Sequence, residues 1–346
     1  MIRTLNAWRG IMAALIVAFH YTQSYELQVM GDFRMSFFFV VSGFLLAQRY
    51  AFDALSWKEY KAFMRRRVLR IFPLHWLVLG LFVLMLGVQY LLTRESDFSV
   101  SNFMLQALLL QSWSPSPEVN HALNTVTWFL SSMMFCYLCY PFVKHFFGRM
   151  KIVTQLLIVL VALAVFMTVQ WHLDGEARKW FVFMFPPMRL VDFSLGVVLC
   201  TIWERGHQDY ERMNVPIWKS LAELGVVALM VLVTMLQYHG VINRFDSRPL
   251  KILLTGFLVL VLAMGDVRGG LLSRALQGPV LGWLGRISYE VYVWQILVLL
   301  ALRNGLAQMG IELREPFMAL IYVCLLLLLS WQSNVRIGRW VKRLRK

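Results

Sequence analysis

Arg9 and His20 are two ionisable residues in an otherwise apolar stretch near the N-terminus, MIRTLNAWRGIMAALIVAFHYTQSYELQ. On an α-helix, residues 9 and 20 are separated by a rise of about 16 Å, and their side chains lie within about 20° of the same face. Ionisable groups at membrane depth are costly and are therefore candidates for function. An imidazole titrates near neutral pH and can act as a general base. The alternative is a structural histidine that hydrogen-bonds to a neighbouring helix.

The second apolar stretch, GDFRMSFFFVVSGFLLAQRY, carries polar residues at its start and in its middle. Asp32 and Arg34 are expected at its outer mouth, not far along the chain from His20. Ser42 and Gly43 have two interpretations. They could allow close packing of two helices, or they could leave backbone exposed along a ligand channel. The sequence favours neither.

A basic segment, KEYKAFMRRRVLRIFPLHW, precedes the third apolar stretch and is expected to be an inner loop. Its arginines either mark the cytosolic side or bind an anionic cytosolic ligand, because the guanidinium fork suits phosphate. The candidate residues are Arg65, Arg66, Arg67 and Arg70. No P-loop or Rossmann glycine pattern is present, so a nucleotide held in either of those ways is not expected.

The stretch FPPMRLVDFSLGVVL places Arg189 and Asp192 one turn apart in an apolar span. They could simply neutralise each other. Pro186 and Pro187, which precede Arg189 and Asp192, should break the helix and open local backbone. This favours the interpretation that the segment forms a cavity wall.

The late stretch LGRISYEVYVWQILVL adds Ser288, Tyr289 and Tyr292 as candidate cavity residues. Glu290 in the same stretch needs a partner, and an arginine of the basic segment could supply one. The histidines are scattered without a second ligand at metal-binding spacing, and the G-x-S-x-G pattern is missing. We therefore expect neither a metal ion nor a serine nucleophile.

The composition requires a membrane protein. Of the 346 residues, 59% are hydrophobic and only 15% are charged, whereas soluble chains have about a quarter charged residues. A span needs about 20 predominantly apolar residues. Stretches that meet this requirement lie at residues 8–27, 33–49, 70–92, 124–143, 152–172, 180–203, 219–239, 249–266, 279–302 and 315–334. They predict an all-α polytopic bundle of about ten transmembrane helices, in one domain over residues 1–346.

Two further features concern topology. Residues 101–112 are apolar but too short to span, so a re-entrant or surface helix is expected there. Most of the 34 lysines and arginines fall in alternate loops and at the C-terminal end, which predicts that both termini are cytoplasmic. The net charge of +15 is then explained by topology and by attraction to anionic lipid of the bilayer, and nucleic acid is not expected as a partner.

Taken together, five motifs resemble those of the membrane acyltransferase 3 family of bacterial envelope O-acyltransferases. Arg9 and His20 match the family's arginine, ten residues, histidine signature. The other four, in the family's order, are FFFVVSGFLL, RRRVLRIFPLHW, RLVDFSLG and LGRISYEVYVWQ. The matches extend from residue 9 to about residue 295.

The resemblance implies a bundle of about ten helices in the bacterial cytoplasmic (inner) membrane. It implies acyl-CoA, with acetyl-CoA expected, as a co-substrate and no permanently bound cofactor. The acceptor would be a hydroxyl of an envelope polysaccharide or lipid-linked glycan. His20 would be the base, and Arg9 and the matched arginines would serve the CoA phosphates or the structure around them. Trp128, in TWFLSSMMF, is a further candidate cavity residue.

Three positions depart from the family pattern. The acidic residues and the histidine that many members carry there are replaced by Ser36, Met133 and Gln295. If a carboxylate orients His20, Asp32 or Asp192 would have to supply it. The acyl group, acetyl or succinyl, and the choice between direct transfer and an acyl-His20 relay stay open, and no oligomeric state is indicated. The competing function is a glycan transporter or a non-catalytic membrane subunit of an envelope polysaccharide system, although no two-half repeat supports a transporter.

Overall fold

The computed structural model describes residues 2–52, 55–94, 98–213 and 215–344. Within these ranges the regular elements are all helical, and no strand is present. The prediction of an all-α fold is therefore confirmed. The helices are α1 (Arg3–Thr22), α2 (Tyr25–Val29), α3 (Gly31–Arg49), α4 (Trp57–Thr93), α5 (Val100–Ala107), η1 (Gln111–Trp113), α6 (Pro117–Asn120), α7 (Trp128–Gly148), α8 (Ile152–Gln170), α9 (Gly175–Phe183), α10 (Pro186–Arg212), α11 (Pro216–Tyr238), α12 (Arg248–Met264), α13 (Leu271–Ala275), α14 (Pro279–Gln308) and α15 (Glu315–Leu344).

Seven stretches of the described chain are long and apolar enough to cross a membrane. They are residues 25–49, 57–93, 152–170, 175–212, 216–238, 279–308 and 315–344. The other three predicted spans coincide with α1, α7 and α12, and α12 has only 17 residues. Helices α8, α11 and α15 expose many large apolar side chains, as expected of helices whose outer faces contact lipid.

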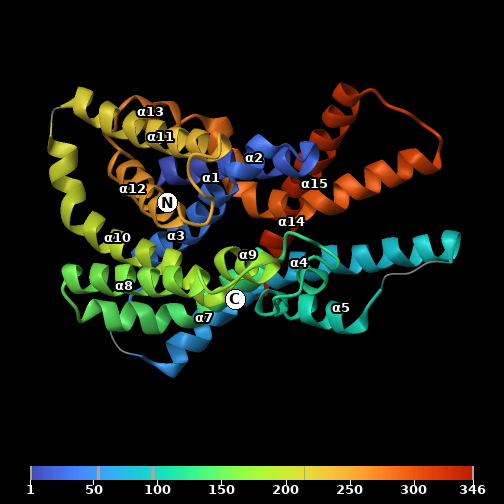
Figure 1. Cartoon of the computed structure of the whole chain (residues 1–346), viewed down its shortest axis with the longest axis horizontal. Helices are drawn as coiled ribbons and strands as arrows, with labels where there is room; N and C mark the ends of the chain where they lie inside the picture. Colours follow the sequence, from blue (N-terminus) through green and yellow to red (C-terminus); the bar gives the residue numbers. More distant parts are fainter. Residues whose placement is uncertain (1, 53–54, 95–97, 214, 345–346) are drawn as a thin grey trace.

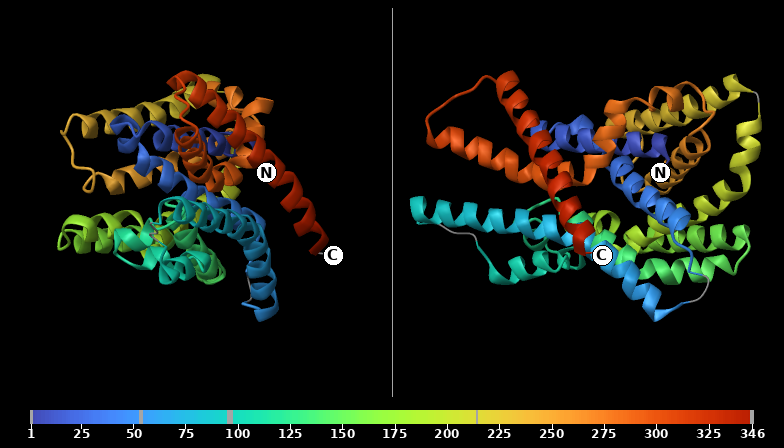
Figure 2. Two further views of the ribbon diagram at one scale, coloured as in Figure 1. Left: turned by 90° about the vertical axis from the view of Figure 1, so that its right-hand side faces the viewer. Right: turned by 180° about the vertical axis from the view of Figure 1, so that it is seen from behind.

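Residues 57–70 form helix and not the inner loop that the sequence predicted. They begin the 37-residue helix α4, which continues through Pro73 and bends partway along its length (Figure 2). Proline removes one backbone donor and crowds the preceding turn, which bends a helix without ending it when both sides are well supported. Here Phe63 is fully buried among Tyr50, Phe52 and Tyr140, so one face of the basic segment packs against α7 and the chain after α3.

The first predicted span also shifts. Helix α1 ends at Thr22 because Gln23 adopts a left-handed conformation, with φ of 54°. Ser24 then caps the short helix α2 by accepting a hydrogen bond from the backbone N–H of Leu27 at 3.3 Å. His20 therefore lies in the last turn of α1, next to a corner in the chain.

Two further local predictions can be compared with the structure. A break separates α9 from α10 just before Pro186, as the proline pair predicted. Residues 101–112 form only α5, of eight residues, and part of η1. They pack against α4 through a hydrogen bond of 2.8 Å between His75 Nε2 and the backbone oxygen of Gln106.

Glycines allow the central helices to cross in close contact. A Cβ atom at Gly43 of α3 would overlap the carbonyl oxygen of Phe193 in α10, and one at Gly196 of α10 would overlap that of Val40 in α3. Gly285 of α14 meets α1 in the same way. Gly43 thus serves close helix packing, which was one of the two interpretations of that motif.

These crossings place α1, α3, α10 and α14 at the centre of the bundle. Helix α12 packs against α3, and α15 packs against α14, as Figure 1 shows. The central helices carry most of the polar residues that the sequence singled out.

Candidate active site

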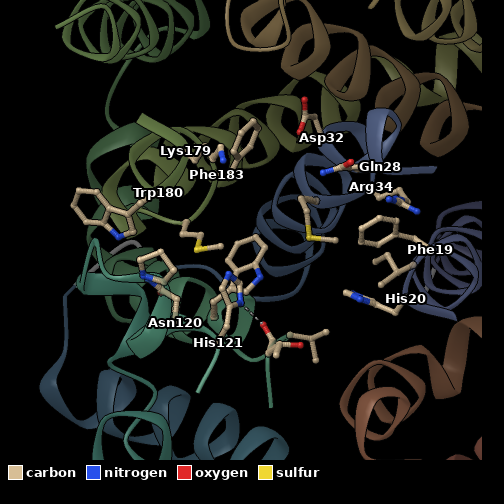
Figure 3. Close-up of a pocket in the computed structure, with 18 of the residues that line it drawn as sticks. Phe19, His20, Gln28, Asp32, Arg34, Asn120, His121, Lys179, Trp180 and Phe183 are labelled. Atoms are coloured by element: carbon tan, nitrogen blue, oxygen red, sulfur yellow. Dashed lines mark hydrogen bonds between the residues drawn. The ribbon is translucent and has the colours of Figure 1, made fainter. Parts of the chain in front are cut away.

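A cavity of about 380 Å³, here called the histidine cavity, lies at the end of α1. Its walls come from α1, α2, α3, α7, α9, α10 and α14, from the chain around α6 and from the chain before α12. The polar residues that line it are His20, Gln28, Asp32, Arg34, Asn120, His121, Thr125, Trp128, Glu176, Lys179, Trp180, Arg189, Arg244 and Tyr292. Figure 3 shows His20 on one wall and Asn120, His121 and Trp180 across from it.

The imidazole of His20 is available to a ligand. Its ring contacts the ring of Phe19, with centroids 4.9 Å apart, and the side chain is half-buried. Within the part of the chain that the structure describes, no residue hydrogen-bonds to the imidazole, and the amide of Gln23 donates instead to the backbone oxygen of His20 at 2.9 Å. A base needs a free ring nitrogen directed at its substrate, and this arrangement leaves one.

Arg34 holds the corner where α1, α2 and α3 meet. Its Nη1 donates to the backbone oxygen of Leu15 and its Nη2 to that of Leu27, both at 2.5 Å. The guanidinium also lies 5.3 Å from the centre of the Phe19 ring. Because Leu15 and Phe19 precede His20 on α1, Arg34 positions the last turn of that helix.

Asp32 is buried and held by two cations. Arg244 Nη2 donates to its Oδ1 at 2.9 Å, and Lys251 Nζ donates to its Oδ2 at 2.8 Å. Lys251 also contacts the side-chain oxygen of Gln237. Both oxygens of the Asp32 carboxylate thus accept hydrogen bonds from cations of α12 and of the chain before it.

Asp192 is also buried and is held in a second cluster. It forms ion pairs with Arg189 at 2.9 Å and Arg248 at 3.3 Å, and it accepts a hydrogen bond from Ser36 at 3.2 Å. Neither Asp192 nor Asp32 hydrogen-bonds to His20, because each is already held by cations. Neither of the two carboxylates that the sequence offered as substitutes therefore orients His20 by a direct hydrogen bond. Ser36 stands where the family pattern has an acidic residue, and it contacts the Asp192 carboxylate supplied by α10.

The chain before α7 is fixed by local hydrogen bonds. Ser116 caps α6 by accepting from the backbone N–H of Val119 at 3.4 Å. Its hydroxyl also donates to the carboxylate of Glu118, which lowers the pKa of Glu118. The Asn120 amide donates to the backbone oxygens of Ser114 and Ser116 at 2.7 and 2.9 Å. These contacts hold Asn120 and the following residue across the cavity from His20.

A second cavity of about 900 Å³, here called the arginine cavity, lies beside the N-terminal half of α1. Five arginines line it, together with tyrosine, serine and amide side chains. The polar lining residues are Asn6, Arg9, Ser42, Gln48, Arg49, Tyr50, Arg67, Arg70, Tyr137, Arg286, Ser288, Tyr289, Tyr292 and Asn334. None of its described lining residues is acidic, so the cavity suits an anionic ligand.

The partner predicted for Glu290 is Arg70, at 3.0 Å. The Arg70 guanidinium also lies 5.1 Å from the centre of the Tyr289 ring, and the Tyr289 hydroxyl donates to the backbone oxygen of Ile71 at 2.7 Å. Asn334 donates to Glu290 at 3.0 Å. These contacts fix Arg70 at the cavity wall, where its side chain is 41% exposed and paired with the buried carboxylate of Glu290.

The four arginines of the basic segment separate into two pairs. Arg67 and Arg70, three residues apart on α4, share a helix face and line the arginine cavity. Arg65 instead donates to the backbone oxygen of Leu344 at 2.7 Å, and Arg66 lies against the Tyr50 ring, outside the lining. The structure therefore does not bring Arg65 and Arg66 into the lining of the cavity, because Arg65 is bound to the end of α15 and Arg66 is held at the Tyr50 ring.

Met35 and Tyr292 line both cavities, so the two cavities adjoin at these residues. The Tyr292 hydroxyl contacts the backbone oxygen of Val126, and its ring lies 5.4 Å from that of Phe129. Tyr292 is thus fixed, whereas methionine is flexible at three bonds. Met35 is the more movable part of the partition.

The remaining residues singled out in the sequence divide between the two sites. Asp32, Arg34, Trp128 and Arg189 line the histidine cavity with His20. Ser42, Ser288 and Tyr289 line the arginine cavity with Arg9. Gly43 and Asp192 line neither of the two cavities, because one is in a helix contact and the other is enclosed by cations.

Several lining residues were not identified from the sequence. His121, Lys179, Trp180 and Arg244 come from loops and from the short helix α9, and no spacing along the chain marked them. Arg49 and Arg286 were counted only as markers of orientation. Their positions at the ends of α3 and near the start of α14 were the available signal.

Comparisons with known proteins bear on the chemistry of these cavities. A family model described as an acyltransferase domain matches residues 2–333. The acyltransferase MdmB of Streptomyces mycarofaciens is 27% identical over an alignment of 307 residues that covers 83% of this chain and 72% of that protein. No solved structure gives a significant match.

Proposed function

This chain belongs to the membrane acyltransferase 3 family, and from that premise we propose that it is an O-acyltransferase of a bacterial cytoplasmic membrane. The proposed donor is a cytosolic acyl-CoA, with acetyl-CoA as the first candidate. The proposed acceptor is a hydroxyl of an envelope or exported polysaccharide, free or lipid-linked. The observation that carries the proposal is that α1 places Arg9 in one cavity and His20 in an adjoining one.

The proposed topology has ten spans in one domain over residues 1–346, with both termini in the cytosol. It is supported by the basic beginning of α4 and the basic end of α15, which meet through Arg65 and Leu344 and project together in Figure 2. Positive charges concentrate on the cytosolic side of membrane proteins. The arginine cavity is then reached from the cytosol and the histidine cavity from the opposite side.

In this proposal the arginine cavity binds the phosphates of the acyl-CoA. Arg9, Arg67 and Arg70 would make charge-assisted hydrogen bonds to the phosphate oxygens, and Arg49 and Arg286 would complete the positive lining. The donor is a co-substrate that arrives and leaves in each cycle, so no permanently bound cofactor is required.

The thioester would reach the histidine cavity between Met35 and Tyr292, which line both cavities. The pantetheine arm is an extended chain, and a narrow passage suits it. Holding the thioester and the hydroxyl in adjoining cavities supplies positioning, which can be a large part of a transfer rate.

His20 would take the proton from the acceptor hydroxyl as that oxygen attacks the thioester carbonyl. The resulting tetrahedral oxyanion is stabilised by the positive charge around the cavity. The carbon–sulfur bond then breaks, the CoA thiolate takes the proton from His20, and the new ester remains on the acceptor. An acyl-His20 relay is the alternative route through the same residue.

The test is the ester-linked acyl content of envelope glycans from cells that produce the wild type, His20→Ala or His172→Ala, with membrane abundance matched. His172 is exposed in the turn after α8 and serves as the control. We expect His20→Ala to abolish acylation of one glycan and His172→Ala to retain it. Unchanged acylation in His20→Ala, together with loss of glycan export, would favour a transporter.

A further inference from the structure

Buried cations outnumber buried carboxylates beside the histidine cavity. In the described part of α3, α10, α12 and the chain before α12, the buried carboxylates are Asp32 and Asp192. The buried cations around them are Arg34, Arg189, Arg248 and Lys251, and Arg244, which is 33% exposed, is a fifth. Two carboxylates cannot neutralise five cations, and an uncompensated buried charge is costly.

Arg34 is the clearest case of an uncompensated charge. Its guanidinium donates to two backbone carbonyl oxygens, which are neutral. Among the described residues it forms no ion pair, since the nearby Asp32 is already bound by Arg244 and Lys251. Arg34 is 2% exposed and lines the histidine cavity.

Three of these cations, Arg34, Arg189 and Arg248, also have unused donors, and the first two line the histidine cavity. Nη2 of Arg189 and Nε of Arg34 are buried and have no hydrogen-bond partner within the described chain. The Arg189 side chain is fully buried, and both residues line the histidine cavity. A buried donor without a partner costs free energy, so these atoms point to a ligand that accepts hydrogen bonds.

Arg244 connects this buried charge to the cavity opening. Its side chain is 33% exposed while it pairs with Asp32 at 2.9 Å, and its guanidinium lies 4.2 Å from the centre of the Phe183 ring. By contrast, Lys179 on the same cavity is paired with Glu176 at 2.6 Å and adds no excess charge. Arg244 is therefore the one cation of this group of five that is partly exposed to solvent.

We propose that the histidine cavity binds a carboxylate or phosphate group of the substrate during acyl transfer, held by Arg34, Arg189 and Arg244. This inference rests on the proposed function and adds the charge class of the substrate. The anion either belongs to the acceptor, as a uronic acid or phosphate substituent, or is the far carboxylate of a dicarboxylic acyl group. In both cases it anchors the substrate a short distance from His20.

The test measures acyl transfer by the purified full-length protein in lipid nanodiscs, with two matched pairs of substrates. In the acceptor pair, acetyl-CoA is offered with a neutral hexose oligosaccharide or with the same oligosaccharide carrying one uronic acid. In the donor pair, the neutral oligosaccharide is offered with acetyl-CoA or succinyl-CoA. We expect a preference of at least about tenfold in kcat/KM for the anionic member of one pair. That pair identifies the source of the anion.

Arg244→Gln should reduce this preference to less than about twofold, because it removes a charge-assisted contact. Arg178→Gln is the matched control. Arg178 likewise pairs with an aspartate, Asp246 at 3.2 Å, and lies 4.5 Å from the centre of a phenylalanine ring, Phe245, but it does not line the cavity. Equal rates within both pairs, or equal effects of the two variants, would overturn the inference.

A binding measurement separates failure of this inference from failure of the proposed function. The apparent Tm of the wild type is followed against sodium glucuronate, with glucose plus sodium chloride at the same ionic strength as reference. We expect a saturable rise in the wild type and in Arg178→Gln that is lost in Arg244→Gln. Absence of transfer from every substrate pair would contradict the enzyme, whereas absence of the glucuronate effect would contradict the anion site.

Discussion

Arg9 and His20 extend from one helix, α1, into two adjoining cavities. Helix α1 thus connects the positively charged arginine cavity to the free imidazole of His20. Met35 and Tyr292 line both cavities, so the proposed transfer requires the thioester to pass between these two residues into the histidine cavity. Each part of this arrangement can be tested separately.

Arg70→Gln should raise the KM for acyl-CoA by about tenfold, because a lost charge-assisted hydrogen bond costs about 1.5–3 kcal/mol when fully expressed. Arg65→Gln, on the same helix but outside the cavity, should leave KM within about twofold. Initial rates at varied acyl-CoA check this. Equal effects of the two variants would contradict the assignment of the arginine cavity to the donor.

Met35→Trp should lower kcat by at least about tenfold while acyl-CoA still binds, because a bulkier side chain would close the passage and leave the five arginines of the arginine cavity in place. Met85→Trp, at a half-buried position of α4 outside both cavities, is the control. Rates and equilibrium binding of acyl-CoA are measured together. Loss of binding in Met35→Trp would show that the two cavities are not separated at this residue.

Gly43→Ala should destabilise the protein by about 1–3 kcal/mol, because the added Cβ would overlap the carbonyl oxygen of Phe193. Gly87→Ala in α4 has open space around the new atom, so it should be neutral or gain up to about 1 kcal/mol from helix propensity. The half-life of each protein in detergent at elevated temperature compares them. A Gly43→Ala variant as long-lived as Gly87→Ala would contradict the close crossing of α3 and α10.

The rate of transfer should fall as the pH is lowered through the ionisation of His20. A general base must be unprotonated to accept a proton. The enzyme should therefore be active when the His20 imidazole is neutral and inactive when it is protonated. The pH profile of kcat/KM should show one ionisation on its acid side, and that limb should be absent from the residual activity of His20→Gln. An unchanged acid limb in His20→Gln would assign the base to another group.

The positions of the long helices could be predicted from the sequence because apolar stretches of span length are read directly from residue types. The local exceptions needed tertiary information. The basic segment was expected to be a loop, yet the packing of Phe63 keeps it helical. The end of α1 was placed at residue 27, whereas a turn at Gln23 ends it at Thr22.

The candidate site could be predicted only where its residues lie on long helices. Arg9 and His20 were found because charges are conspicuous in an apolar span, and Arg70 because it belongs to a run of arginines. Arg244 comes from a loop, and nothing in its neighbourhood distinguishes it from other surface arginines. The ion-pair partners of Asp32 and Asp192 could not be predicted from the sequence either, because α12 contacts α3 and α10 only in the folded chain.

The central claim is that one helix serves both substrates, and the most direct measurement compares acetyl-CoA binding with acetyl transfer in Arg9→Ala and His20→Ala. We expect Arg9→Ala to weaken acetyl-CoA binding by about tenfold. His20→Ala should bind acetyl-CoA as the wild type does but transfer acetyl at least about a hundredfold more slowly. Wild-type transfer by His20→Ala, or loss of acetyl-CoA binding in that variant, would contradict the account.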